Sequence, residues 1–270
     1  MTVPLRRDNG EYEHYTGFRS IHSRHASPAK GGMRMDPDTD LNECDALSML
    51  MSVKNAIVKL PFGGSNGGIR VDTKGMSIAE VDRLTRRYAV DMAKHGFFSP
   101  AIDVPGPDYG TNENTMAVMM DAYRHYKPND VNHMCSVSGK PKDVGGIKGR
   151  SEASGLGTFY ALRHYLNNAE NMKEIGLTPG IAGKTCVLQG LGMVGYHFGK
   201  AATENGMKII GLIEYNGGIS SDTGIDINAA KMYFAQNGSL EGFPDSTFNP
   251  RRDDLLTMAC DVLVPAAMES

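Results

Sequence analysis

The segment that most constrains the fold is an apolar strand followed by a glycine-rich turn, a helix and a second strand. The strand TCVLQ leads into the turn GLGMVG, which carries Gly190, Gly192 and Gly195, and MKIIGLI then leads to Glu214. This order matches the GxGxxG fingerprint of a dinucleotide-binding βαβ unit, whose glycines let the backbone approach a pyrophosphate at the helix N-terminus. Glu214 would accept hydrogen bonds from the ribose, which favours NAD without excluding NADP. The alternative is a glycine turn that only packs strand against helix.

The rest of the pattern predicts two α/β domains. Capping residues, stop residues and apolar spacing predict four helices in the first half, over about 41–59, 78–95, 113–126 and 151–168. The polar stretch NNAENMKEIGLTPGIAG then separates a first domain, residues 1–170, from a second, residues 171–270. The second domain adds a helix between Asp226 and Gly238 and a buried strand in CDVLVP. The fold class is therefore α/β, with an N-terminal substrate and oligomerisation domain followed by an incomplete Rossmann-like dinucleotide-binding domain.

Composition excludes several classes of function. The 28 basic and 31 acidic residues give a formal net charge of −3, which is no electrostatic footprint for nucleic acid or an anionic membrane. No apolar run approaches the roughly 18 residues of a spanning helix, and the N-terminus lacks a signal-peptide core, so we expect no membrane partner and no targeting segment. The four cysteines form no CxxC pair, and His22 with His25 has no third partner at suitable spacing, so we expect no metal site.

Three segments of the first domain combine glycines with an ionisable group: PAKGGMRM, KNAIVKLPFGGSNGGI and AIDVPGPD. We interpret them as rigid loops that expose their backbone. Lys30 and Lys54 in these segments suit a dicarboxylate, because glycine lets a substrate approach the backbone while lysine supplies the countercharge. The alternative is that both lysines are ordinary solvated side chains.

The order of these motifs resembles the glutamate/leucine/phenylalanine/valine dehydrogenase family, and within it the hexameric, eukaryotic-type glutamate dehydrogenases. The resemblance runs from PLRRDNGEYEHYTGFRSIHSRHASPAKGG through KLPFGGSNGGI, IDVPGPD, SGKPKDVGGIKGRSEASGLG and LTPGIAGKTCVLQGLGMVG to CDVLVPAA, effectively the whole chain. It implies NAD(P)-dependent oxidative deamination of L-glutamate to 2-oxoglutarate and ammonia. It also implies a homo-oligomer, a hexamer in the family, located in the mitochondrial matrix or the cytoplasm.

The resemblance further implies roles for individual residues. Lys30 would pair with the side-chain carboxylate of glutamate and Lys54 with its α-carboxylate, and Asp103 would move protons at the α-nitrogen. Arg150 would lie near the substrate, and Ser154 stands where family members have a threonine that contacts the nicotinamide amide. Branched-chain and aromatic members tend to carry an apolar residue at the position of Lys30, so glutamate is the expected substrate.

One departure from the family pattern affects the position of the catalytic lysine. The family motif PFGGxKGG places its catalytic lysine where this chain, with PFGGSNGG, has Asn66. An amide is neutral at physiological pH, so it can orient a water but cannot carry the proton of that water. We therefore expect turnover to be impaired or absent while substrate binding survives. Lys54 or Lys59 could substitute for the lysine, and an engineered Lys-to-Asn change is a further interpretation.

A second departure is length, because family members continue beyond CDVLVPAA and carry a segment before RRDNG. We expect either a fragment of a longer product or partner chains that cover exposed surfaces. Two functions stay open: an amino-acid dehydrogenase with an impaired site, or a pseudoenzyme that serves as a structural or nucleotide-binding subunit of a larger assembly. Binding of glutamate or NAD without turnover would distinguish that subunit from a generic interaction module.

Overall fold

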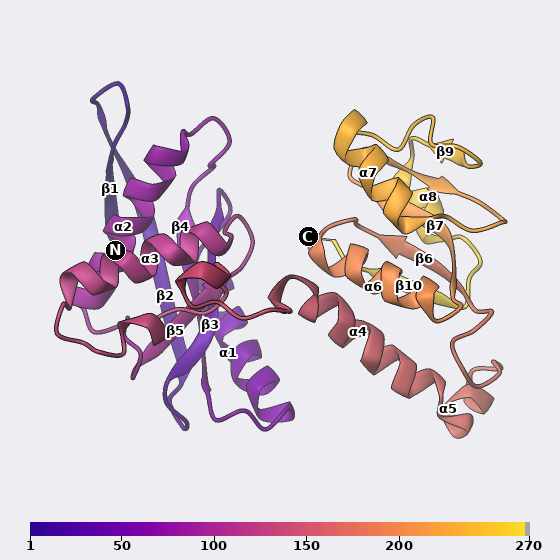
Figure 1. Cartoon of the computed structure of the whole chain (residues 1–270), viewed down its shortest axis with the longest axis horizontal. Coiled ribbons are helices and arrows are strands. Elements are labelled where there is room, and N and C mark those ends of the chain that lie inside the picture. The colour runs from indigo at the N-terminus through magenta and orange to yellow at the C-terminus, as the bar shows by residue number, and fades with distance from the viewer. Residues whose placement is uncertain (268–270) are drawn as a thin grey trace. The chain divides into compact units, whose positions relative to one another are not determined.

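The computed structural model describes residues 1–267 and divides the chain into two compact units, Met1–Lys148 and the residues from Gly149 onwards (Figure 1). This division precedes the boundary at residue 170 that the sequence predicted. Helix α4 (Arg150–Leu166) accounts for the difference, because it packs along α6 (Met193–Glu204) and so belongs to the second unit.

The first unit is built on a five-stranded sheet in the order β1-β2-β4-β3-β5. Its strands are β1 (Thr2–Arg6), β2 (Tyr12–Ser23), β3 (Ala29–Asp36), β4 (Gly63–Arg70) and β5 (Asp103–Pro107). β1, β2 and β4 are antiparallel neighbours, whereas β3 runs parallel to both β4 and β5. The unit is therefore a mixed α/β structure, as predicted.

The glycine-rich segments that we interpreted as loops are strands of this sheet. PAKGGMRM contains most of β3, the second half of KNAIVKLPFGGSNGGI forms β4, and AIDVPGPD contains β5. Glycine is a poor strand former, so the sequence pattern indicated loops instead of strands. Close packing requires glycine here, because a Cβ on Gly64 would lie 2.3 Å from the backbone nitrogen of Ser52 in α1 (Leu41–Ile57).

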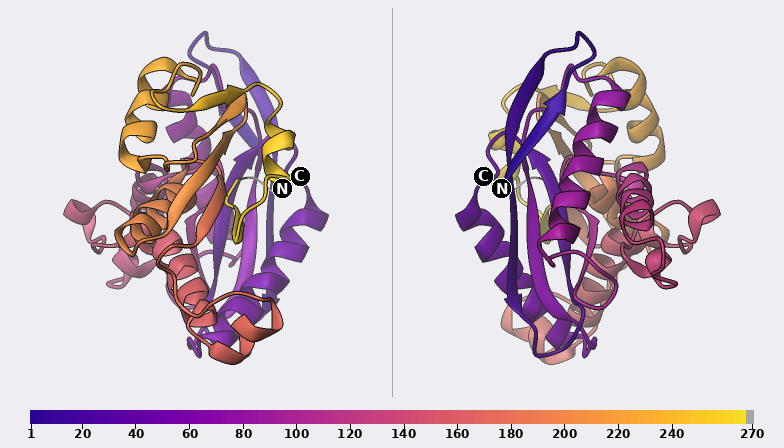
Figure 2. Two further views of the ribbon diagram at one scale, coloured as in Figure 1. Left: turned by 90° about the vertical axis from the view of Figure 1, so that its right-hand side faces the viewer. Right: turned by 90° about the vertical axis from the view of Figure 1, so that its left-hand side faces the viewer.

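Three helices cover the two faces of the first sheet. α1 lies on one face, and α2 (Ile78–Lys94) with α3 (Glu113–Tyr126) lies on the other (Figure 2). These elements confirm the three helices predicted for this part of the chain. The α2 and α3 face holds the hydrophobic core, which includes Met33, Met35, Ile69, Leu84, Tyr88, Met116 and Met119. The α1 face instead buries small and polar side chains of that helix: Cys44, Ser48, Ser52 and Asn55.

The second unit has its own five-stranded sheet, in the order β10-β6-β7-β8-β9. Its strands are β6 (Thr185–Gln189), β7 (Lys208–Glu214), β8 (Gly217–Ser220), β9 (Thr247–Asn249) and β10 (Val262–Pro265). β10, β6 and β7 are parallel, which confirms the three predicted strands and the Rossmann-like arrangement. β8 and β9 are antiparallel, and the sequence did not indicate them because both are short and lack a run of alternating apolar residues.

Helices cover both faces of the second sheet. α4, α6 and α7 (Ile227–Asn237) enclose the larger core, and α8 (Arg252–Leu256) packs on the opposite face through Leu255. A short helix, α5 (Ala169–Glu174), follows α4. α7 begins after Asp226 and ends at Gly238, as predicted. Within residues 1–267, no helix combines the length and the apolar character that crossing a membrane requires.

Candidate functional site

Strand alternation brings four polar residues to one face of the first sheet. Lys30 of β3 pairs with Gly64 of β4 and with Val104 of β5, and side chains of paired residues point to the same face. Met33 and Met35, at the alternate positions of β3, point into the core on the other face. The face opposite the core therefore carries Lys30, Arg34, Asn66 and Asp108.

Asp108, which directly follows β5, is the carboxylate that contacts Asn66. Asn66 Nδ2 donates to Asp108 Oδ2 at 3.3 Å, and Arg34 Nε lies 3.2 Å from the same oxygen. Gly32 makes room for this carboxylate, because a Cβ there would lie 2.3 Å from Asp108 Oδ2. Thr111 fixes the turn, since its hydroxyl accepts from the Asp108 backbone nitrogen at 2.9 Å. The sequence analysis missed Asp108, because the strand register that places it on the face of Lys30 is visible only in the folded chain.

Asp103, the predicted proton carrier, lies on the core face instead. Its carboxylate is fully buried and accepts from Arg19 Nε at 2.6 Å, from Arg19 Nη2 at 2.7 Å and from the Ser65 hydroxyl at 2.6 Å. Arg19 is itself 3% exposed and donates to the Gly32 carbonyl at 2.6 Å. The structure therefore does not bring Asp103 together with Lys30 and Asn66. Its geometry is that of a buried structural ion pair.

Lys30 shares its end of the face with Ser138, which the sequence analysis also missed. Gly106 of β5 lets both side chains come close to its backbone, since a Cβ there would lie 2.9 Å from Lys30 Nζ and 2.8 Å from Ser138 Oγ. The Ser138 backbone nitrogen donates to the Pro105 carbonyl at 2.9 Å, which holds this loop against β5. The Lys30 ammonium and the Ser138 hydroxyl thus both lie close to the Gly106 backbone, an arrangement that can bind a carboxylate.

Lys54 lies on α1, about three turns after Glu43 and on the same side of the helix. Glu43 Oε1 accepts from Arg34 Nη1 at 2.5 Å, which connects this side of the helix to the face that holds Asp108. Lys54 is exposed. The capping box at the start of α1 is half formed, because Asp40 accepts from the Glu43 backbone nitrogen at 2.8 Å while the Glu43 side chain contacts Arg34.

The three motif glycines of the second unit have separate structural roles. Gly190 has a φ of +94°, which turns the chain sharply after β6. A Cβ on Gly195 would lie 2.0 Å from the Gly190 carbonyl oxygen, so its absence lets α6 pack on the turn. Gly192 caps α6 and faces open space, with no atom within 4 Å of a Cβ placed there. The glycine turn and the N-terminus of α6 together fit a pyrophosphate.

Glu214 stands at the end of β7, as predicted, and its carboxylate contacts the glycine turn. Glu214 Oε1 accepts from the Leu191 backbone nitrogen at 2.5 Å. Lys231 of α7, which the sequence analysis did not single out, donates to the carbonyl oxygen of the same Leu191 at 2.5 Å. The turn is therefore fixed by two side chains from different elements.

Arg150 and Ser154 belong to the second unit, although the sequence placed them in the first domain. Arg150 is the first residue of α4, and both side chains are exposed. A Cβ on Gly155, the neighbour of Ser154, would lie 2.6 Å from the carbonyl oxygen of Val194, near the start of α6. This contact packs α4, at the neighbour of Ser154, against the start of α6. Arg150, one turn earlier, is the first residue of the helix.

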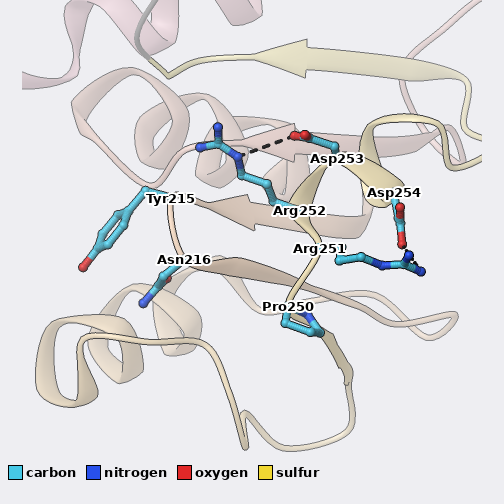
Figure 3. Close-up of a pocket in the computed structure, with 7 residues that line it drawn as sticks. All are labelled: Tyr215, Asn216, Pro250, Arg251, Arg252, Asp253 and Asp254. Atoms are coloured by element: carbon cyan, nitrogen blue, oxygen red, sulfur yellow. Dashed lines mark ion pairs between the residues drawn. The ribbon is translucent and has the colours of Figure 1, made fainter.

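The second unit also has a polar hollow of about 440 Å³ beyond the end of β7 (Figure 3). Its lining residues are Tyr215, Asn216, Pro250, Arg251, Arg252, Asp253 and Asp254. Arg251 Nη2 lies 3.0 Å from Asp254 Oδ2, and Arg252 Nε lies 3.5 Å from Asp253 Oδ1, so the charges of the hollow are balanced in pairs. Within residues 1–267, no three His, Cys, Asp or Glu side chains are grouped so as to hold a metal ion.

Comparison with known families matches both units of the chain. Residues 1–125 match the dimerisation domain of the Glu/Leu/Phe/Val dehydrogenases, and residues 145–270 match the Glutamate/Leucine/Phenylalanine/Valine dehydrogenase domain. The chain belongs to the Glu/Leu/Phe/Val dehydrogenase family. An N-terminal α/β unit followed by a Rossmann-like unit is accordingly the architecture of this family member.

Individual relatives of this family member are glutamate dehydrogenases. A mitochondrial glutamate dehydrogenase of Dictyostelium discoideum is 42% identical over 269 residues, and an NADP-specific glutamate dehydrogenase of Saccharolobus shibatae is 37% identical over 270 residues. The hetero-hexameric glutamate dehydrogenase of Thermus thermophilus, solved in a leucine-bound form, has a TM-score of 0.87 at 34% identity and is matched by 99% of this chain. The chain spans 54%, 61% and 60% of these three proteins, respectively.

Proposed function

We propose that this chain carries a glutamate dehydrogenase site, for NAD(P)-dependent oxidative deamination of L-glutamate to 2-oxoglutarate and ammonia, and that Asn66 impairs the reaction. The observation that carries the proposal is the convergence of Lys30, Asn66 and Asp108 on one face of the first sheet. The relationship to glutamate dehydrogenases of three organisms supports the choice of substrate.

The first unit would bind the substrate through two lysines. The Lys30 ammonium and the Ser138 hydroxyl, which both lie close to the Gly106 backbone, would hold the side-chain carboxylate. Lys54 would pair with the α-carboxylate, and Arg150 would add a positive charge near the substrate. Charge-assisted hydrogen bonds of this kind select a dicarboxylate over a substrate with an apolar side chain.

We assign the proton transfer at the α-nitrogen to Asp108 in place of Asp103. Asp108 is partly exposed and contacts Asn66, whereas both oxygens of Asp103 are taken by Arg19 and Ser65. Asn66 can hold a water by hydrogen bonds, but it supplies neither a proton nor a charge. Binding should therefore survive while turnover falls.

The second unit would bind NAD or NADP, which accepts the hydride from the α-carbon. Gly190, Gly192 and Gly195 would seat the pyrophosphate, and Ser154 would lie beside the nicotinamide. Glu214 would meet the adenosine ribose. The open space at Gly192 and the close contact of Gly195 support this fit to a dinucleotide.

A non-catalytic role is the second candidate, because Asn66 stands at the position of the proton-carrying lysine. The chain would then serve as a structural or nucleotide-binding subunit. In either case we propose a homo-oligomer or a larger assembly, with a hexamer as the expected form, and a location in the mitochondrial matrix or cytoplasm. The hetero-hexameric and mitochondrial relatives support these proposals.

Dicarboxylate binding tests the proposal without requiring turnover. We expect isothermal titration calorimetry to detect 2-oxoglutarate binding to the whole chain, and Lys30→Met to weaken it by about 10-fold or more, the usual effect of losing a charge-assisted hydrogen bond. Lys74→Met, at an exposed lysine of the same unit, is the control and should leave the affinity unchanged. Absence of binding to the parent chain, or equal affinity in the Lys30 variant, would refute the substrate assignment.

Two glycine variants separate cofactor binding from folding. Gly192→Ala adds a methyl group to open space, so the melting temperature should stay within a few degrees of the parent while NADH binding weakens by about 10-fold or more. Gly195→Ala forces a Cβ to 2.0 Å from the Gly190 carbonyl and should lower the melting temperature. Thermal unfolding and NADH fluorescence titration measure the two effects. Unchanged NADH affinity in a folded Gly192→Ala chain would contradict a pyrophosphate site there.

A further inference from the structure

The backbone N–H and the backbone C=O of Leu191 are held by side chains of opposite charge. Glu214, at the end of β7, accepts from its nitrogen at 2.5 Å, and Lys231, on α7, donates to its carbonyl oxygen at 2.5 Å. Leu191 is 1% exposed, whereas Glu214 and Lys231 are only partly buried. A carboxylate and an ammonium thus reach the same residue of the dinucleotide turn from different elements.

Among the residues that the structure describes, Lys231 forms no ion pair, and its ammonium donates to a neutral carbonyl. Arg251 and Arg252 of the same unit, by contrast, pair with Asp254 and Asp253. An ammonium has three donors, and the Leu191 carbonyl uses one of them. Lys231 is therefore equipped to bind a further anionic group beside the turn.

The position of Glu214 indicates which anionic group this would be. In dinucleotide-binding units, the acidic side chain at the end of the second strand lies against the 2′ position of the adenosine ribose. NADP carries a phosphate at that position, and Glu214 alone would repel it. A cation that reaches the same residue as Glu214 offsets this repulsion, and Lys231, which contacts Leu191, is placed to do so.

We propose that Lys231 is a specificity-determining residue that admits the 2′-phosphate, so that the chain binds NADPH as well as NADH. The inference rests on the dinucleotide binding proposed above. Lys231 also steadies the glycine turn through the Leu191 carbonyl, but that contact affects both cofactors alike. Discrimination between the cofactors is the property that a purely structural lysine would not have.

Fluorescence titration of the whole chain with NADH and with NADPH tests the inference. Lys231→Met keeps most of the side-chain volume and removes the charge, and Lys231→Arg restores a cation. Lys200→Met, at an exposed lysine of α6, is the matched control. We expect Lys231→Met to raise the dissociation constant of NADPH about 10-fold or more and that of NADH less than about 3-fold. Lys231→Arg should retain most of the NADPH affinity, and Lys200→Met should change neither constant.

The outcomes distinguish this inference from the proposed function. Equal weakening of both cofactors in Lys231→Met would reduce Lys231 to a support of the turn and overturn the inference. Unchanged affinity for both, or a parent chain that binds NADH but no NADPH, would overturn it as well. A parent chain that binds neither cofactor would refute the proposed dinucleotide site itself, and the inference with it.

Discussion

Replacing Asp103 with asparagine should lower the free energy of unfolding of the first unit by about 3–5 kcal/mol, the usual cost of breaking a buried ion pair on one side. Asp103 is fully buried, and the side chain of its partner Arg19 is 3% exposed, so solvent cannot compensate the guanidinium that remains. Asparagine keeps the volume but removes the charge that Arg19 faces through two hydrogen bonds. Urea unfolding followed by far-ultraviolet circular dichroism measures the loss.

Asp108→Asn is the matched control for this prediction. Its side chain is 24% exposed and its ion pair with Arg34 is longer, at 3.2 Å, so we expect the free energy of unfolding to change by less than about 1 kcal/mol. In chains that also carry Asn66→Lys, glutamate turnover should respond in the opposite order, because only Asp108 faces position 66. In that background, a stable, inactive Asp103→Asn chain beside an active Asp108→Asn chain would return the proton-transfer role to Asp103.

Local signals in the sequence were sufficient for most helices and for the parallel strands of the second unit. N-cap side chains, stop glycines and apolar spacing depend on neighbours within a few residues, so α3 and α7 were predicted nearly to the residue. The dinucleotide turn was also recognisable, because the conformation of Gly190 and the packing of Gly195 are properties of the motif itself. The unit boundary was placed too late because the packing of α4 on α6 is a tertiary contact.

The site of the first unit depended on contacts that the sequence does not display. Glycine-rich β4 is a strand because α1 packs directly on it, and no local preference indicates that. Strand alternation then decides which carboxylate reaches the site, and it places Asp108 with Lys30 and Asp103 on the opposite face. Ser138 and Lys231 come from segments distant from the motifs they join, so only the folded chain brings them to their partners.

Replacing Asn66 with lysine should raise the rate of glutamate oxidation by about 10²–10⁴-fold, or about 3–5 kcal/mol in activation free energy. A lysine at this position would extend toward Asp108 Oδ2, which Asn66 Nδ2 now reaches at 3.3 Å, and would supply a titratable group and a positive charge. Neither Lys54 nor Lys59 readily replaces a lysine at position 66. Lys54 lies on α1 and Lys59 follows that helix, and both side chains are exposed. Substrate affinity should change much less than turnover, since Lys30 is retained.

The most direct test of the account is the initial rate of glutamate-dependent reduction of NAD and of NADP by the parent chain and by its Asn66→Lys variant, measured side by side. We expect little or no reduction by the parent and clear reduction by the variant, with similar Michaelis constants for glutamate wherever both can be measured. Equal rates in the two chains would show that the proton chemistry does not pass through position 66. Inactivity of both, in chains that remain folded, would contradict a dehydrogenase site on this face of the sheet.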